Sequence, residues 1–227
     1  MTRPITNVKT DFLIVHGSRG YGLNKPDSDW DFRGFFLPEA RHVLGFIDGP
    51  EQSMQKTDEI DATSYDIRKF FNLASGCNPN VVETLFGDPA DQVVTSPAAK
   101  IVLMNRHLFL SKKARYAFGG YAVGQLRKVR AGTWDDAAVR KDAMHMMRLL
   151  DFGTQILRNS DLNIRVKNPD YMRDIRAGKV TREEVLLNAD SLIQRMDDLV
   201  TDSDLPESPD VTKLNEILIE IIREFVL

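Results

Sequence analysis

The chain has 227 residues, of which 42% are hydrophobic and 28% are charged, as is usual for a globular protein with a buried core. Its formal net charge of −3 argues against a protein that coats nucleic acid through bulk charge, although a local basic face is compatible with it. The single cysteine, Cys77, excludes an intramolecular disulfide. We find no signal-peptide pattern and no segment as long as a membrane span, so we expect a cytoplasmic protein with no membrane partner.

A glycine-rich turn follows the first predicted strand. Residues 11–16 are apolar and partly β-branched, which predicts a short buried strand. This strand runs directly into the string Gly17-Ser18-Arg19-Gly20-Tyr21-Gly22. A backbone that turns at glycines can bring its N–H groups close to a phosphate, and Ser18 adds a hydroxyl group. The turn is therefore a candidate phosphate-binding site.

Two aspartates begin the second predicted strand. Asp29 and Asp31 lie two residues apart in Asp-Trp-Asp-Phe-Arg-Gly-Phe-Phe, so both carboxylates should leave the same face of a strand. Like charges this close repel each other unless a cation lies between them. Taken alone, the pair would also fit an exposed turn, because residues 26–29 have turn composition. The Gly17-Ser18 pair that precedes them favours a magnesium site beside the turn.

The rest of the chain predicts further sheet elements and then helices. We expect a short helix at 39–44, a polar loop at 48–59, a strand at 60–65, and helices at 66–76 and 79–87. Strand signals nearly vanish afterwards, and helices are predicted at 97–107, 112–130, 135–158, 169–177, 181–200 and 211–226. The predicted fold class is therefore α+β, with a small mixed sheet covered by helices in residues 1–95 and an all-helical domain in residues 96–227.

These motifs resemble the nucleotidyltransferase superfamily related to DNA polymerase β. The signature of that superfamily is an apolar residue before Gly-Ser, a short spacer, and then Asp-apolar-Asp-apolar, which Gly17-Ser18 and residues 29–32 match. The fuller strings Gly-Ser-Arg-Gly-Tyr-Gly-Leu and Pro-Asp-Ser-Asp-Trp-Asp-Phe-Arg-Gly resemble a bacterial and phage branch of predicted nucleotidyltransferases, some of them associated with RNA repair. The resemblance implies that residues 1–95 form a catalytic core and that residues 96–227 complete a nucleotide and acceptor cleft.

The resemblance also implies a two-metal site. Two metal ions can lower the pKa of an attacking hydroxyl group and hold a triphosphate. We expect Asp29 and Asp31 to bridge two Mg²⁺ ions, with Mn²⁺ as the alternative, and a third carboxylate to complete the site. Asp61 fits this role best, because residues 65–71 resemble the strand-to-helix junction of the superfamily; Asp66 is the alternative, but it also suits a helix N-cap. Asp29, Asp31 and Asp61 are thus the predicted metal ligands and catalytic residues.

A set of basic residues is expected to bind the phosphates of the NTP substrate. Lys141, His145 and Arg148 are spaced i, i+4, i+7 and should share one helix face, and their counterparts in the resembling branch suggest a triphosphate clamp. A solvated polar face is the alternative for all three, and a histidine at a domain interface is the alternative for His145. Arg19 and Arg33 flank the aspartates and could pair with them or bind phosphate. The predicted nucleotide-binding residues are Gly17, Ser18, Arg19, Lys141, His145 and Arg148.

Residues 112–130 form a basic segment with interleaved aromatic residues. The segment carries six lysines and arginines and no acidic residue, and it contains Tyr116, Phe118 and Tyr121. Such a segment could follow the backbone of a single-stranded nucleic acid and stack on its bases. The aromatic residues could instead belong to the core of the helix, which we favour for Phe118.

The sequence therefore predicts an enzyme that transfers an NMP from an NTP to an acceptor hydroxyl. An RNA 3′ end is the expected acceptor, because of the basic segment and the RNA-repair association of the resembling branch. The alternatives are a protein hydroxyl, as in AMP-transferring relatives of toxin–antitoxin pairs, and a nucleotide-binding or RNA-binding module without turnover. The choice of NTP, the use of a template and the oligomeric state are not determined by the sequence.

Overall fold

The computed structural model of the chain describes residues 3–227, and these divide into two compact units. The first unit contains the described residues up to Ser75 together with Asn80–Phe109 and Pro209–Leu227. The second unit contains Gly76–Pro79 and Leu110–Ser208. The change in composition near residue 95 therefore falls inside the first unit.

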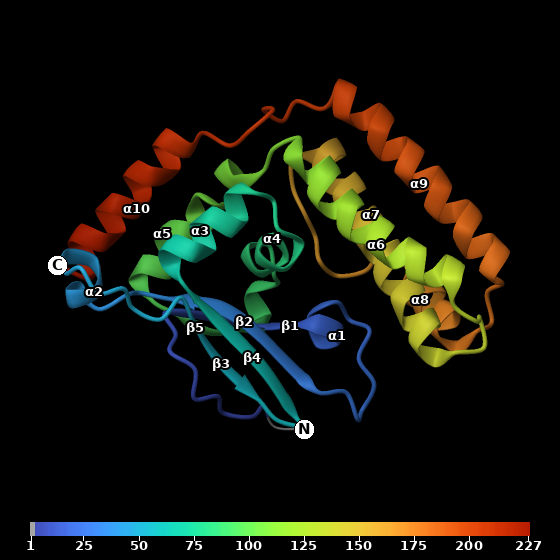
Figure 1. Ribbon diagram of the computed structural model, residues 1–227, viewed down its shortest axis with the longest axis horizontal. Coiled ribbons are helices and arrows are strands. Elements are labelled where there is room, and N and C mark those ends of the chain that lie inside the picture. Colours follow the sequence, from blue (N-terminus) through green and yellow to red (C-terminus); the bar gives the residue numbers. More distant parts are fainter. Residues whose placement is uncertain (1–2) are drawn as a thin grey trace. The chain divides into compact units, whose positions relative to one another are not determined.

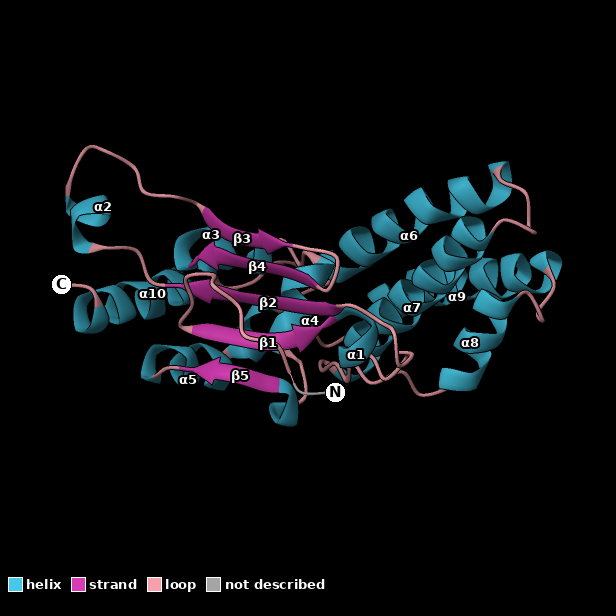
Figure 2. Cartoon of the chain, turned by 90° about the horizontal axis from the view of Figure 1, so that it is seen from below, coloured by secondary structure: helices cyan, strands magenta, loops and turns pink. Residues whose placement is uncertain are grey.

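A five-stranded mixed sheet forms the centre of the first unit (Figure 2). Its strands are β1 (Phe12–His16), β2 (Trp30–Phe36), β3 (Gln52–Lys56), β4 (Ile60–Asp66) and β5 (Gln92–Thr95). Their order in the sheet is β3-β4-β2-β1-β5; β2 and β4 are parallel, and all other neighbours are antiparallel. The predicted α+β class is thus confirmed.

Helices cover one face of this sheet (Figure 1). They are α3 (Ile67–Ser75), α4 (Pro79–Leu85), α5 (Pro97–Met104) and α10 (Val211–Phe225). The ring of Phe35 from β2 lies between Phe12 of β1 and Phe70 of α3, with centroid distances of 5.7 Å and 5.0 Å. Helix α10 contacts α3 and α5, which explains why the last helix of the chain belongs to the first unit. A short helix α2 (Ala40–Leu44) lies in the connection between β2 and β3.

The opposite face of the sheet is covered by the N-terminal segment. Arg3 donates a hydrogen bond to the carbonyl of Gln92 in β5, and the N–H of Lys9 donates to the hydroxyl of Ser53 in β3. The segment therefore crosses the sheet from one edge strand to the other. Val8 of this segment packs into a buried cluster with Leu13, Val15, Phe32, Ile60 and Ala62 of the sheet.

Two strands of the sheet were not predicted. β3 lies inside residues 48–59, which the sequence predicts to be a loop, and β5 lies in the predicted connection before α5. Both are edge strands that pair with the sheet on one side only. β3 is polar and largely exposed, so its sequence lacks the apolar alternation that marks a half-buried strand. Its pairing with β4 supplies the strand conformation that local sequence does not indicate.

The second unit is a group of four helices. They are α6 (Lys113–Ala131), α7 (Ala137–Asn159), α8 (Pro169–Ala177) and α9 (Arg182–Asp202). Helix α7 is the most buried of them and contacts the other three. The predicted cap at Thr181 is present, since its hydroxyl accepts a hydrogen bond from the N–H of Glu184. Across residues 3–227, none of the helices combines the length and the apolar character needed to cross a membrane.

Candidate active site

Two of the three predicted carboxylates are direct neighbours in the sheet. Asp31 of β2 is the register partner of Asp61 of β4, and His16 of β1 is the partner of Asp31 on its other side. Because register partners point to the same face, these three side chains form a row across three strands. Asp29 is exposed and lies just before β2, two residues ahead of Asp31. The sheet therefore brings Asp31 and Asp61 together, with Asp29 adjacent to them along the chain.

The glycine turn packs directly against Asp31. Helix α1 (Gly17–Gly20) is a single turn, and Gly17 has φ of +61°, in the left-handed region that favours glycine. A Cβ atom on Gly17 would lie 1.8 Å from Oδ2 of Asp31. Hydrogen bonds from Tyr21 N to Gly17 O (3.0 Å) and from Leu23 N to Ser18 O (2.8 Å) close the turn. Only glycine allows the turn to start this close to the carboxylate.

The hydroxyl group of Ser18 is available to a ligand of this turn. Its Oγ atom is buried and has no hydrogen-bond partner within the described part of the chain. Buried polar side-chain atoms normally have a partner, so a hydroxyl left without one points to a ligand or a water molecule at this position. A phosphate oxygen is a suitable partner, because a serine hydroxyl can donate to it.

Arg33 lies between the two neighbouring carboxylates. Its Nη1 donates to Oδ1 of Asp61 at 2.9 Å and to the carbonyl oxygens of Phe32 and Asp61, both at 2.8 Å. Its Nη2 is 4.0 Å from Oδ1 of Asp31. Of the two roles predicted for Arg33, the structure therefore shows the one in which it pairs with aspartate. This guanidinium reduces the repulsion between the carboxylates.

The carboxylates fit magnesium by their chemistry. Mg²⁺ prefers oxygen ligands and needs only a few carboxylates, since it retains several waters. Within residues 3–227, however, no three acidic, histidine or cysteine side chains are grouped closely enough to hold a metal ion. Asp61 is bound to Arg33 and approaches Lys56, whose Nζ lies 3.9 Å from its Oδ2. The two-metal site with Asp29, Asp31 and Asp61 thus stays a prediction, in which a cation must compete with Arg33.

Arg19 contacts the segment that leads into β2. Its Nε donates to the carbonyl of Asp29 at 3.1 Å, and its Nη2 donates to the carbonyl of Ser28 at 2.6 Å. The guanidinium also lies 4.1 Å from the centroid of the Trp30 ring. These contacts connect the glycine turn to the residues around Asp29, so Arg19 orders the loop that carries one of the predicted metal ligands. Its predicted role as a phosphate ligand is not tested by these contacts.

A buried acid supports both ends of the glycine turn, and the sequence analysis missed it. Glu83 of α4 is completely buried; its Oε2 accepts a 2.5 Å hydrogen bond from the hydroxyl of Tyr21 and lies 3.6 Å from Nε2 of His16. His16 directly precedes Gly17, and Tyr21 directly follows Gly20. Glu83 therefore ties the start and the end of the turn to α4. The available signal was an acidic residue within the mostly apolar string Val-Val-Glu-Thr-Leu-Phe.

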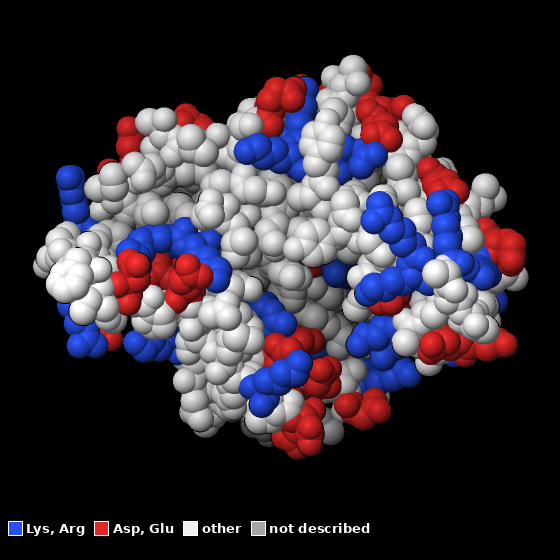
Figure 3. Space-filling model, viewed as in Figure 1, with Lys and Arg blue, Asp and Glu red and all other residues white. Residues whose placement is uncertain are grey.

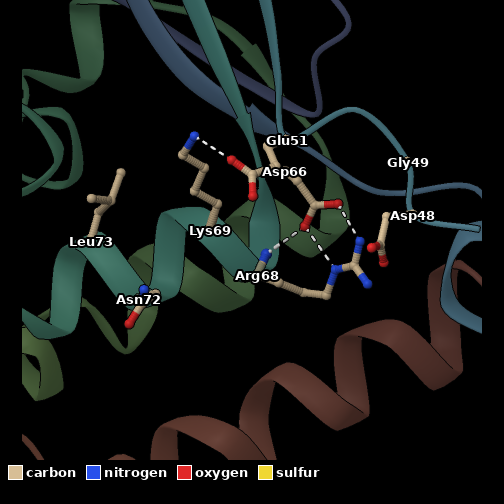
Figure 4. Close-up of a pocket in the computed structure, with 8 residues that line it drawn as sticks. All are labelled: Asp48, Gly49, Glu51, Asp66, Arg68, Lys69, Asn72 and Leu73. Atoms are coloured by element: carbon tan, nitrogen blue, oxygen red, sulfur yellow. Dashed lines mark hydrogen bonds and ion pairs between the residues drawn. The ribbon is translucent and has the colours of Figure 1, made fainter.

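Asp66, the alternative third carboxylate, has a different environment (Figure 4). It is the last residue of β4, and strand alternation directs it to the face opposite that of Asp61. Its carboxylate accepts hydrogen bonds from the backbone N–H of Arg68 at 2.8 Å and from the Arg68 guanidinium at 3.0 Å and 2.8 Å. Asp66 thus caps the start of α3, as the sequence allowed. Asp61 shares a face with Asp31 and Asp66 does not, so the register is compatible with Asp61 as the third carboxylate, which stays a prediction.

The predicted clamp residues lie on α7 in the second unit, and we call Lys141, His145 and Arg148 the α7 basic face. Lys141 is exposed, His145 is half-buried, and Arg148 is buried with its guanidinium 5.2 Å from the ring of Phe152. Burial, followed by the positive charges of Arg148 and Lys141, lowers the pKa of His145 to about 4. His145 is therefore neutral at pH 7, in a positively charged environment that suits an anion.

Comparisons with known proteins bear on the whole chain. A family model described as "RNA repair pathway DNA polymerase beta family" matches residues 4–220. An uncharacterized 38.9 kDa protein from the nrdC-mobD intergenic region of Enterobacteria phage T4 is 31% identical over 134 residues. That match covers 53% of this chain and 39% of the phage protein, which is less than half of the relative's length. No solved structure gives a significant match.

The Glu83 network yields a stability prediction. Tyr21→Phe removes the hydroxyl that donates to a fully buried carboxylate, so we expect the free energy of unfolding to fall by about 1–3 kcal/mol. Tyr116→Phe is the matched control, because Tyr116 is 74% exposed and its hydroxyl should contribute less than about 0.5 kcal/mol. Urea unfolding measures both. Equal midpoints for the two variants would contradict the supporting role assigned to the network.

The α7 basic face yields a pH prediction. NMR titration of His145 should give a midpoint near pH 4, and Lys141→Gln should raise it by removing a neighbouring positive charge. In the unfolded chain the pKa of His145 is near 6.5, so the unfolded state binds a proton at a higher pH than the folded state does. The contribution of His145 to the free energy of unfolding is therefore fully present above about pH 6.5 and is lost as the pH falls toward 4.

Phosphate binding beside His145 can be tested by the same titration. Saturating tripolyphosphate should raise the midpoint of the His145 titration, because the anion stabilises the imidazolium. An unchanged midpoint would exclude phosphate binding beside His145.

Proposed function

We propose that this chain, which belongs to the RNA repair pathway DNA polymerase β family, transfers an NMP from an NTP to an acceptor hydroxyl, with an RNA 3′ end as the acceptor. The family is one of polymerase β-like nucleotidyltransferases involved in RNA repair. The observation that carries the proposal is the register pairing of Asp31 with Asp61 beside the Gly17 turn. This arrangement brings a candidate phosphate-binding backbone and acidic side chains to one end of the sheet.

The reaction joins the acceptor oxygen to the α-phosphorus and breaks the bond from that phosphorus to the bridging oxygen of the β-phosphate. Pyrophosphate leaves, and the acceptor hydroxyl would give its proton to the neighbouring carboxylate of Asp61, which would release it to water. When bound, Mg²⁺ would supply charge neutralisation and would lower the pKa of the attacking hydroxyl. We assign Asp29, Asp31 and Asp61 as its ligands, with Mn²⁺ as a substitute. Asp61 is the proposed neighbour of the attacking hydroxyl, where its carboxylate would accept the hydrogen bond of that group.

The triphosphate would be bound by groups that donate hydrogen bonds or carry positive charge. The buried hydroxyl of Ser18 supports this assignment, because it has no partner among residues 3–227. The backbone of Gly17 approaches Asp31 so closely that a phosphate held by the turn would lie near the carboxylates. The proposed NTP ligands are Gly17, Ser18, Arg19, Lys141, His145 and Arg148.

A module that binds nucleotide without turnover is the second candidate. The observation in its favour is the ion pair between Arg33 and Asp61, which uses the side chain that we assign as a metal ligand. In this case the guanidinium would replace the cation permanently. The two candidates differ in whether pyrophosphate is released.

The decisive experiment incubates the protein with each α-³²P-labelled NTP, Mg²⁺ and total cellular RNA or protein. We expect labelled RNA with the label at the 3′ end, and we expect Asp31→Asn to reduce the labelling by roughly 100-fold or more, since the metal site loses a charged ligand. Asp58→Asn is the matched control, because Asp58 is an exposed aspartate in the turn between β3 and β4.

The possible outcomes separate the candidates. Label on protein in place of RNA would retain the transfer reaction and correct the acceptor to a protein hydroxyl, as in an AMP-transferring toxin. Calorimetric NTP binding with no pyrophosphate release in the presence of either extract would favour the non-catalytic module. Equal labelling by the wild type and Asp31→Asn would contradict the assigned site.

A further inference from the structure

Helix α6 presents an exposed face of tyrosines, glycines and cations, which we call the α6 face. It consists of Lys113, Tyr116, Gly120, Tyr121, Gly124 and Arg127. At 3.6 residues per turn these side chains project from one side of the helix, with Tyr116 and Tyr121 toward opposite margins and the two glycines between them. Helix α6 contains no acidic residue. The face therefore combines aromatic rings with positive charge.

The aromatic residues of α6 divide between the core and the solvent. Phe118 is fully buried, as the sequence analysis favoured, whereas Tyr116 is 74% exposed and Tyr121 is 50% exposed. The hydroxyl of Tyr121 accepts a hydrogen bond of 3.3 Å from the side chain of Asn78, which helps to orient its ring while half of the residue remains accessible. The two exposed rings are thus not needed for the core, and they are suited to stacking on nucleobases.

Most of the basic residues in this segment are neutralised by acids of the same unit, but two are not. The ion pairs are Lys112 with Glu207, Arg115 with Asp197, Lys128 with Asp142 and Arg130 with Asp190. In the described part of the chain, Lys113 and Arg127 have no ion-pair partner. They lie near opposite ends of the α6 face, about 21 Å apart at the helical rise. Figure 3 shows lysine and arginine side chains gathered over the C-terminal part of α6.

The space between the tyrosines is open. A Cβ atom built on Gly120 or Gly124 would meet no atom within 4 Å, so neither glycine is required by packing inside the protein. Glycine in the interior of a helix is less favourable than alanine. Because Gly120 and Gly124 have no side chains, the helix backbone between the exposed tyrosines is uncovered, and a flat ligand could approach it closely.

We propose that the α6 face binds a single strand of RNA, with bases stacked on Tyr116 and Tyr121 and phosphates paired with Lys113 and Arg127. The choice of RNA rests on the acceptor in the proposed function; the location rests on exposure and charge complementarity. A polyanion that presents flat apolar rings matches a surface with uncompensated cations and exposed tyrosines. The α6 face then binds the acceptor strand through residues other than those assigned to the NTP.

The test measures the affinity of a fluorescein-labelled single-stranded oligoribonucleotide by anisotropy, without NTP. We expect Tyr116→Ala and Tyr121→Ala each to weaken binding by about 5-fold or more, since each removes a stacking surface. Arg127→Gln should weaken binding and reduce the slope of log affinity against log salt by about one. Phe46→Ala and Lys213→Gln are the matched controls, because they change an exposed aromatic residue and an exposed cation in the first unit and should not alter the affinity.

Gly120→Ala distinguishes a direct loss of RNA binding from a loss of folding, because this variant should be more stable than the wild type. Gly120→Ala should raise the unfolding temperature by about 2–4 °C, because alanine favours the helix and the added methyl group meets no atom of the protein. The same variant should bind RNA more weakly if the strand approaches the helix backbone. Wild-type affinity in all of the α6 variants would overturn the proposal.

RNA binding by the α6 face and the proposed transfer reaction can be contradicted by different results. A wild-type protein that binds no oligoribonucleotide but transfers NMP to protein would overturn the α6 assignment and leave the transfer reaction in place. RNA binding that depends on Tyr116 and Tyr121, in a protein that transfers no NMP to any acceptor, would support the α6 face and contradict the proposed function.

Discussion

The close packing of Gly17 against the carboxylate of Asp31 is the constraint on which the candidate site depends. A side chain at residue 17 would collide with Oδ2 of Asp31, and the backbone there adopts a positive φ. This contact fixes where the glycine turn begins relative to β2. Because Asp31 is in register with Asp61 on the parallel strand β4, the same contact also places the turn beside the carboxylates of these two strands.

Polar groups on both sides of this contact have partners within the protein. Glu83 is fully buried and contacts Tyr21 and His16, which flank the turn, so these contacts also hold the turn's two ends. Arg33 is held by Asp61 and lies near Asp31, where it offsets the repulsion between neighbouring carboxylates. The contacts of Glu83 are buried and support the glycine turn. The contacts of Arg33 are partly exposed, and in the proposed function a divalent cation bound by the aspartates would perform the same electrostatic role as the guanidinium.

The sequence predicted those features whose chemistry is local along the chain. Gly17, Asp29 and Asp31 fall in one short stretch, and helical spacing alone places the predicted clamp residues on one side of α7. Strand β3 was missed because an exposed edge strand depends on its partner more than on its own composition. Glu83 was missed because its contact with Tyr21 spans 62 residues, and no local pattern reports such a distant pairing.

We propose that the contact between Gly17 and Asp31 builds a joint site for a divalent metal ion and an NTP. The most direct measurement is binding of Mn²⁺ by electron paramagnetic resonance in the presence of a non-hydrolysable NTP analogue, for the wild type and for Gly17→Ala. We expect at least about 10-fold weaker Mn²⁺ binding in Gly17→Ala, because the added methyl group must displace the Asp31 carboxylate. Mn²⁺ affinity equal to that of the wild type, in a variant that remains folded by circular dichroism, would contradict this proposal.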